Sequence, residues 1–254
     1  MKKIFYAVAV ILIACNNESK DEKTLAKTSA PETISTSGNS GPGCGSLVLF
    51  RKGAVIETTN FDAAGKEVSK QITTVKDVID EGGITIASSS AQSSTPGSKP
   101  FNLIYKCDGK NLYMDLASMM QNLAVLKDAK ADVKTLAFPL NIKEGETLPE
   151  SSVSVAMDRG AIKMNIKTTY KNRTVGAKEK ITTPAGSWNC YKINNDIEST
   201  VDSPDEKTKK IMDAVNNNTK MRMVFWYAPE FGFVKMETYR NDKLTGYNET
   251  TAVK

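Results

Sequence analysis

Apolar and polar residues alternate along most of the chain after residue 43. Alternation with period two over short segments is typical of β-strands with one buried and one solvated face. In the first half, turns rich in Gly and Pro separate these segments, which predicts an antiparallel meander. The predicted strands run over Ser46 to Arg51, Ala54 to Asp62, Glu67 to Val78, Ile84 to Ser90 and Phe101 to Cys107. Asp108-Gly109 then predicts a type I′ hairpin, whose two central residues need positive φ.

The same alternation resumes after a loop that contains three turn-forming residues, Pro139, Gly145 and Pro149. Apolar side chains at Val153, Val155 and Met157, and again from Ile162 to Ile166, predict a hairpin around Arg159-Gly160. Thr174 to Thr182 continues this hairpin. Three more predicted segments follow: Ser187 to Asn194, Thr219 to Ala228 and Phe233 to Arg240. Leu244 to Val253 forms the last strand. A capping box that begins at Ser203, with proline at the first helical position, predicts a short exposed helix through Val215.

One segment has helical rather than strand periodicity. Asp115 is a suitable N-cap, and five apolar residues follow it on one stripe. They are Leu116, Met119, Met120, Leu123 and Leu126. We expect a helix from Asp115 to Lys127 to pack against the sheet; alternatively, its methionines line an adaptable apolar pocket. The predicted fold is therefore α+β and β-rich, with one strongly curved antiparallel sheet, a half-barrel, covered by one main helix.

The first residues form a different pattern, typical of a bacterial lipoprotein signal. Lys2 and Lys3 precede a short apolar run, and Leu12-Ile13-Ala14-Cys15 places a small residue before a cysteine. We predict cleavage before Cys15 and acylation of its thiol and new amino group, which would anchor the protein to a membrane. An ordinary secretory signal that happens to contain Cys15 is the alternative.

The next segment, Asn16 to Gly43, is almost free of apolar residues and predicts a disordered tether. A coil of this length spans roughly 30 Å root-mean-square. The predicted organisation is thus a signal peptide over residues 1–14, a lipidated tether over 15–43 and a single β-rich globular domain over 44–254.

Acylation of Cys15 leaves three cysteines in an oxidising compartment, with three possible single pairings. Cys107 and Cys190 lie on or beside predicted strands, whereas Cys44 lies in a flexible Gly-Pro-Gly-Cys-Gly segment that could reach either of them. We favour a disulfide between Cys107 and Cys190, and a linkage of Cys44 stays open.

The chain has no histidine, so the usual general base of serine, cysteine and metal-dependent hydrolysis is missing. There is no Cys-x-x-Cys, no Gly-x-Ser-x-Gly, no phosphate-binding loop, no dinucleotide glycine pattern and no EF-hand loop. We therefore predict a protein that is not an enzyme, without catalytic residues, metal ligands or cofactors. A hydrolase with a Ser-Lys dyad or a carboxylate pair is the less favoured alternative.

The distribution of charge along the chain bears on possible binding partners. The formal net charge is +5, from 34 basic and 29 acidic residues, and the two signs are interspersed without a run of five like charges. This pattern favours neither nucleic acid nor an anionic membrane surface as a partner.

Six aromatic residues gather near the C-terminus: Phe225, Trp226, Tyr227, Phe231, Phe233 and Tyr239. We expect them to pack across strands. The alternative is the wall of a binding groove. In that alternative, the candidate apolar pocket comprises Leu116, Met119, Met120, Leu123 and Trp226.

An ordered set of short motifs resembles that of the TapB family, uncharacterised lipoproteins of the Bacteroidota. The set is Cys44, Asn60 to Lys66, Tyr105 to Gly109, Thr183 to Gly186, Cys190 to Ile193, Trp226 to Ala228 and Gly232 to Lys235. The resemblance implies a distant likeness to periplasmic lipoprotein carriers, in which an antiparallel sheet curls into a half-barrel over a helix. It carries no catalytic residues. The segment from Ser203 to Asn218 departs from the family pattern and resembles an insertion.

These observations lead to an outer-membrane lipoprotein that faces the periplasm or the cell surface. Lys20 with its flanking acids Glu18, Asp21 and Glu22 resembles a short signal that sends some Bacteroidota lipoproteins to the surface; otherwise it is an ordinary polar tether. The leading hypothesis is a non-catalytic binding or carrier domain for a lipid, another apolar ligand or an envelope component. The alternative is an interaction lipoprotein that presents a sheet edge or the inserted helix to an envelope protein partner.

Overall fold

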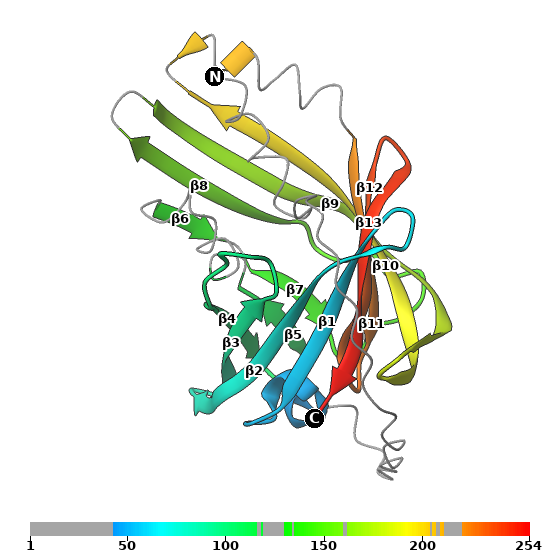
Figure 1. Ribbon diagram of the computed structural model, residues 1–254. Helices are drawn as coiled ribbons and strands as arrows, with labels where there is room; N and C mark the ends of the chain where they lie inside the picture. The colour runs from blue at the N-terminus through cyan, green and yellow to red at the C-terminus, as the bar shows by residue number, and fades with distance from the viewer. Residues whose placement is uncertain are drawn as a thin grey trace.

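The computed structural model describes residues 43–115, 118, 130–133, 135–159, 162–203, 205, 206, 209, 210 and 220–254. The predicted signal peptide, Cys15 and the tether up to residue 42 lie outside these ranges. Within the described residues, thirteen strands form one antiparallel sheet (Figure 1). The strands are β1 (Val55–Asp62), β2 (Glu67–Glu81), β3 (Ile84–Ser93), β4 (Phe101–Cys107), β5 (Asn111–Met114), β6 (Lys130–Val133), β7 (Leu136–Pro139), β8 (Ser151–Arg159), β9 (Ile162–Thr183), β10 (Gly186–Asp202), β11 (Met221–Ala228), β12 (Gly232–Arg240) and β13 (Lys243–Val253).

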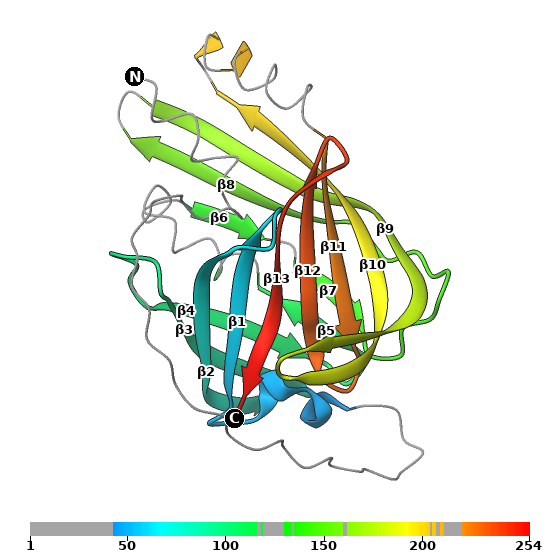
Figure 2. The same cartoon turned by 45° about the vertical axis from the view of Figure 1, so that its right-hand side comes forward.

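The sheet is rolled into a nearly closed barrel, from which β8 and parts of β9 and β10 extend as an arm (Figure 2). The strand order is β6-β8-β9-β10-β11-β12-β13-β1-β2-β3-β4-β5-β7. Most neighbours in the sheet are neighbours in sequence, as expected of a meander. The pairing of β1 with β13 joins the two ends of the domain, where Val55 and Lys254 exchange two backbone hydrogen bonds of 2.9 Å.

The predicted α+β class and its half-barrel under a helix are wrong. The described residues form an all-β fold and contain no helix of seven or more residues. The predicted helix from Asp115 to Lys127 lies almost wholly outside the described residues; at its start, the Asp115 carboxylate accepts the expected hydrogen bond from the Ser118 amide, at 3.1 Å. The apolar face is covered by the sheet itself, because thirteen twisted strands suffice to curl it around its own core.

The predicted strand from Ser46 to Arg51 is also wrong. Two 3-10 turns replace it, η1 (Cys44–Ser46) and η2 (Val48–Phe50). Four consecutive residues here are at most 7% exposed: Leu47, Val48, Leu49 and Phe50. A strand would have turned every second side chain outward, whereas this compact segment buries all four. It acts as a plug at one end of the barrel and is tied to the β11–β12 turn by the Val48 amide, which donates to the Phe231 carbonyl at 3.2 Å.

Two apolar clusters lie on opposite sides of the sheet. The larger one fills the barrel interior and includes Phe138, Phe225 and Tyr227. The smaller one comprises buried Cys190, Val224, Trp226, Ala228 and Val234, with Ile181 and Trp188 packed against it. The β9–β10 hairpin bends back over this part of the sheet, where the Thr183 hydroxyl donates to the Thr250 carbonyl (Figure 2).

The turns only partly follow the sequence prediction. Asp108-Gly109 is not a type I′ turn, because Gly109 has φ of 80° while Asp108 is not among the residues with positive φ. The type I′ geometry occurs instead at Asn241 and Asp242, with φ of 48° and 60°, between β12 and β13. Strands β5, β6 and β7 were not predicted, because four residues are too few for an alternating pattern to stand out.

Candidate functional site: an interior cavity and the barrel seam

An interior cavity of about 90 Å³ lies between the plug and the surrounding strands. Its apolar wall comes from the plug residues Val48 and Leu49 and from Ile56, Tyr105, Phe231 and Phe233. Its polar wall comes from Thr58, Gln71, Thr73 and Thr250. Such a space is far smaller than the roughly 300 to 1,000 Å³ of a pocket for a drug-sized ligand. It suits a small molecule, or one end of a larger one, that has an apolar side and a polar side.

The polar wall follows from a particular strand pattern. In β2, the residues that face the interior are Ser69, Gln71, Thr73 and Val75, all uncharged, while Lys70 and Lys76 face outward. The Gln71 amide donates to the Thr73 hydroxyl at 3.2 Å, and the Thr250 hydroxyl donates to the Phe233 carbonyl at 3.2 Å. The sequence analysis missed these residues. The sequence pattern that could have predicted this polar wall is the series of uncharged polar side chains at every second position of the strand.

The interior also contains polar atoms whose hydrogen bonding is incomplete. The hydroxyls of Ser89 and Tyr227 are buried and have no hydrogen-bond partner among the described residues. An unpaired buried hydroxyl costs about 1 to 3 kcal/mol, so these groups favour a water molecule or a polar ligand group nearby. Burial raises the pKa of Tyr105 in the cavity wall to about 12, so its hydroxyl stays protonated and able to donate at neutral pH.

A buried arginine bridges β7 and β9, which are not neighbours in the sheet; we call this junction the seam of the barrel. Arg173 on β9 is 1% exposed, and its guanidinium donates to three acceptors. These are the Ala137 carbonyl on β7 at 2.7 Å, the Pro149 carbonyl at 2.7 Å and the Asn195 side-chain oxygen at 3.0 Å. The guanidinium also lies 5.1 Å from the centre of the Phe138 ring. Because β7 and β9 are not paired by a strand ladder, this side chain and the 140–149 segment connect them.

The environment of Arg173 is unusual for a charged side chain, because the side chain is buried. No ion pair of Arg173 with a carboxylate occurs among the described residues. Burial lowers the pKa of its guanidinium to about 10, because a charge is disfavoured away from water. Asn195, which is fully buried, accepts from Arg173 and donates to the Ile193 and Met223 carbonyls. Arg173 therefore holds β7, the Pro149 segment and β10 together at the seam.

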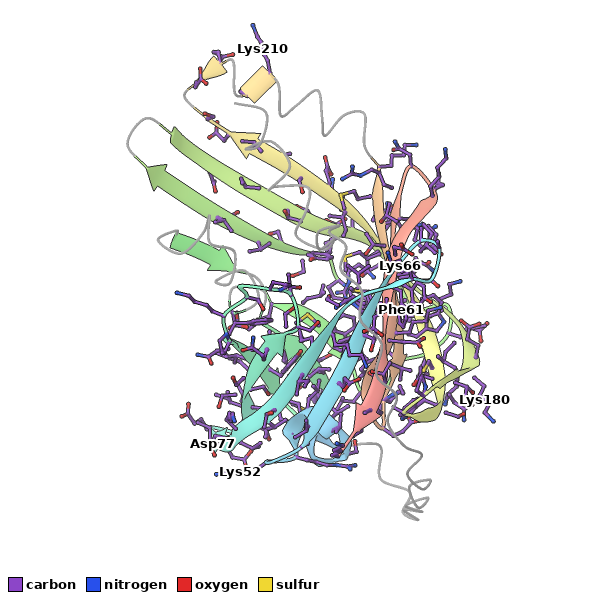
Figure 3. All side chains as sticks on the ribbon, viewed as in Figure 1. Lys52, Phe61, Lys66, Asp77, Lys180 and Lys210 are labelled. Carbon is purple, nitrogen blue, oxygen red and sulfur yellow. A yellow bond between two sulfur atoms is a disulfide. The ribbon has the colours of Figure 1, made fainter. Side chains whose placement is uncertain are left out.

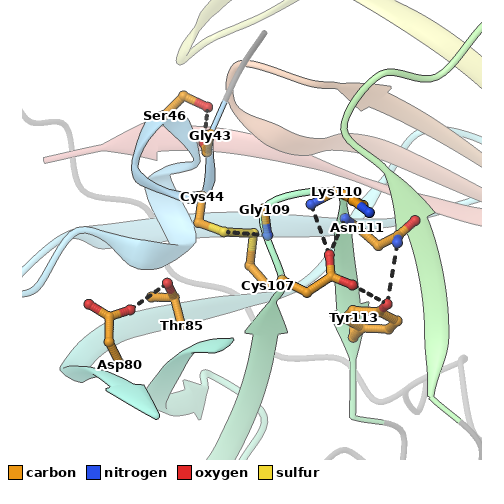
Figure 4. Close-up of a disulfide and its surroundings, with 11 residues drawn as sticks. Gly43, Cys44, Ser46, Asp80, Thr85, Cys107, Gly109, Lys110, Asn111 and Tyr113 are labelled. Atoms are coloured by element: carbon orange, nitrogen blue, oxygen red, sulfur yellow. Dashed lines mark hydrogen bonds between the residues drawn. A yellow bond between two sulfur atoms is a disulfide. The ribbon is translucent and has the colours of Figure 1, made fainter. Parts of the chain in front are cut away.

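The disulfide joins Cys44 to Cys107, with 5.8 Å between the Cα atoms (Figure 4). The favoured pairing of Cys107 with Cys190 is wrong. Cys107 packs in the interior cluster near the plug, whereas Cys190 is a buried free thiol in the cluster on the other side of the sheet. The bond fixes the plug to the end of β4, and the Gly109 amide donates to the Cys44 sulfur at 3.2 Å.

Beside the disulfide, Asp108 organises the β4–β5 turn (Figure 4). Its carboxylate accepts hydrogen bonds from the Lys110 and Asn111 amides at 2.8 and 2.7 Å and from the Tyr113 hydroxyl at 2.7 Å. Burial alone would raise the pKa of this carboxyl, but the three hydrogen bonds outweigh burial and lower it to about 2.

The predicted apolar pocket stays a prediction, because of its five residues only Trp226 is among the described ones. Leu116, Met119, Met120 and Leu123 lie outside the described residues. Trp226 is buried in the second cluster, where its indole N–H donates to Glu179 and the Lys192 and Lys235 ammonium groups lie 5.3 and 4.8 Å from its ring centre. Of the six C-terminal aromatic residues, Phe231 and Phe233 line the cavity.

Among the described residues, no three His, Cys, Asp or Glu side chains are placed to hold a metal ion together. In the same part of the chain, no helix is long and apolar enough to cross a membrane.

Comparisons with known proteins complete the description. A family model described as DUF3108-like matches residues 51–250. No curated protein matches the sequence. Among solved structures, a protein of YmcC-like fold from Bacteroides fragilis, predicted to be exported, has a TM-score of 0.58 and 18% identity over 80% of this chain and 96% of its own. A predicted lipoprotein from Parabacteroides distasonis has a TM-score of 0.59 and 20% identity, over 81% of this chain and 96% of its own. At these identities the likeness concerns the fold alone.

Proposed function

The chain belongs to the DUF3108-like family, and from this premise we propose that it is an envelope-anchored, non-catalytic binding lipoprotein whose barrel interior accepts a small amphipathic ligand. The observation that carries the proposal is the two-sided cavity between the plug and the sheet. The predicted lipoprotein signal at Cys15 supports an envelope location, and one of the similar structures is itself a predicted lipoprotein. Membership of the TapB family stays a prediction.

The size of the cavity restricts which ligands the proposed carrier could bind. With about 90 Å³ it has no room for a whole acyl chain, so the ligand is small, or enters by one end only. Its polar part would meet Gln71 and the threonines, and its apolar part would pack on Phe233 and the plug. The unpaired hydroxyls of Ser89 and Tyr227 elsewhere in the interior also favour bound polar groups. The absence of histidine from the chain argues against a hydrolase.

Matched leucine substitutions on β2 test this proposal. Thr73 faces the cavity, whereas its neighbour Thr74 faces away from it and is half-buried. Thr73→Leu should fill the cavity and abolish binding, while Thr74→Leu should leave binding unchanged. The measurement is an NMR titration with phenol, a small amphipathic probe, combined with native mass spectrometry of the untreated protein for a co-purified small molecule.

Saturable shifts at residues that line the cavity, lost in Thr73→Leu and kept in Thr74→Leu, are the expected result. If phenol causes no saturable shifts in the parent protein and no small molecule co-purifies, the cavity is a packing defect and the binding function is rejected. The alternative, an interaction lipoprotein that binds an envelope protein, would then become the favoured hypothesis.

A further inference from the structure

Large exposed apolar side chains are confined to one ribbon of the described sheet. They are Ile72 and Ile79 on β2 and Ile84 on β3, with exposures of 46%, 43% and 39%. Ile79 lies directly opposite Ile86, and Ile84 precedes Ile86 by two residues on the same face. Ile79, Ile84 and Ile86 therefore form one contiguous group on the outer face of the β2–β3 hairpin end, which we call the isoleucine patch. Val78 and Ala87, the neighbouring pair, face the interior, and Ala87 is fully buried.

The isoleucine patch lies at the end of the barrel where the predicted tether enters the domain. Thr85, next to Ile84, is paired with Cys107, and Cys107 is bonded to Cys44. Figure 4 shows Thr85 and Asp80 near the disulfide-bonded Cys44. Gly43 is the first described residue, so the described chain begins at the same end of the barrel as the patch. The disulfide holds this part of the chain in place.

Geometry then relates the patch to the membrane. The predicted tether, 28 residues between Cys15 and Cys44, would span roughly 30 Å as a coil, about the diameter of a small domain. An acylated Cys15 therefore keeps this end of the barrel within reach of the lipid surface, at a high effective concentration. At such concentrations, a few exposed isoleucines contribute to contact, because burying apolar surface is favourable roughly in proportion to its area.

The charges around the patch indicate the kind of contact. Lys52 forms an ion pair with Asp77 at 2.8 Å, and both lie at this end of the molecule (Figure 3). Lys76, Asp80 and Glu81 on β2, and Lys106 on β4 opposite Ile86, add charges of both signs. The surroundings thus carry both signs, and contact would depend on apolar insertion rather than on attraction to anionic headgroups.

We propose that the isoleucine patch docks on the bilayer in which Cys15 is anchored, so that the barrel stands with its plug end toward the lipid. The inference rests on the lipid anchor of the proposed function, but it does not depend on the cavity. It assigns the outer face of the β2–β3 hairpin end to the interfacial lipid region.

Tryptophan reporters in the full acylated chain test this orientation. Ile84→Trp places a reporter in the patch, and Lys66→Trp places one at the opposite end of β2, in the β1–β2 turn (Figure 3). Each chain is reconstituted in phosphatidylethanolamine–phosphatidylglycerol vesicles with or without lipid brominated near the headgroup. The parent chain gives the background from Trp188 and Trp226.

Bromine should reduce the added Ile84→Trp fluorescence at least about twofold, at low and at high salt, because the reporter enters the headgroup boundary. The added Lys66→Trp fluorescence should not change. Absence of quenching at Ile84→Trp, or equal quenching at both positions, would overturn the docking and leave the patch to a protein partner. Flotation of the same vesicles reports the anchor separately: a chain that does not float overturns the anchor and the docking together.

Discussion

Replacing Arg173 should open the seam of the barrel. In Arg173→Met the side chain keeps much of its apolar volume but loses every donor. The carbonyls of Ala137 and Pro149 and the side-chain oxygen of Asn195 then lose their hydrogen bonds at 2.7 to 3.0 Å. Two of these acceptors belong to the backbone and cannot be replaced, so water must enter or the acceptors stay unpaired.

The size of the effect follows from two opposing terms. Three buried acceptors left unpaired, at about 1 to 3 kcal/mol each, would cost about 3 to 9 kcal/mol in free energy of unfolding. Removing the buried charge recovers about 3 kcal/mol, since burial lowers the pKa of Arg173 from 12.5 to about 10 and a tenfold change corresponds to about 1.4 kcal/mol. The difference between the two terms is about 0 to 6 kcal/mol, and we expect a net loss near the middle of this range, about 2 to 4 kcal/mol. Arg173→Lys should recover only part of this loss, because an ammonium group cannot reach all three acceptors in the planar fork geometry.

Urea unfolding measures the free energy, and hydrogen exchange locates the change. The amides of β7 should exchange faster in Arg173→Met, whereas those of β1 and β13 should keep their protection until global unfolding. Lys180→Met is the matched control, because Lys180 lies on the same strand and is exposed (Figure 3). Its unfolding free energy should change by less than about 0.5 kcal/mol. If Arg173→Met is no less stable than this control, the seam does not depend on Arg173.

Four other predictions can be tested with single substitutions. Cys15→Ala should release the protein from membranes or leave its precursor uncleaved; unchanged fractionation and mass would reject the anchor. Cys44→Ser should lower stability by about 2 to 4 kcal/mol, since the disulfide closes a loop of 63 residues, whereas Cys190→Ser should leave the non-reducing peptide map unchanged. Asp108→Asn should lower the free energy of unfolding by about 1 to 2 kcal/mol at neutral pH. The lowered pKa of Asp108 gives stability that is present above pH 4 and is lost as the pH falls toward 2, so parent and variant should become equally stable there. A difference in stability that stays constant with pH would contradict this account. Gly246→Ala should cost about 1 to 3 kcal/mol in urea unfolding, since its Cβ would lie 2.8 Å from the Phe61 carbonyl oxygen, and Gly45→Ala, with nothing within 4 Å, is the control.

Local pattern determined most of the strands. The alternation along β1 to β4 and β8 to β13 was sufficient to locate them, because side-chain direction in a strand is fixed by the backbone residue by residue. The predicted segment of β10 ended at Asn194, whereas the strand continues to Asp202. The hairpin of β8 with β9 was confirmed, as was its continuation over Thr174 to Thr182, and the structure joins these segments into one strand, β9. The absence of histidine likewise needs no structure.

Only the tertiary structure decided how these strands close. Arg173, within Asn172-Arg173-Thr174, is indistinguishable in sequence from a solvated charge; it is buried because Ala137, Pro149 and Asn195 come from distant positions to accept its hydrogen bonds. The disulfide partner of Cys107 depended on which face of the sheet each cysteine occupies, and Cys190 lies in the cluster on the other face. The fold class was wrong because a period-two pattern states which side of a strand is apolar, whereas what covers that side depends on how far the whole sheet curls.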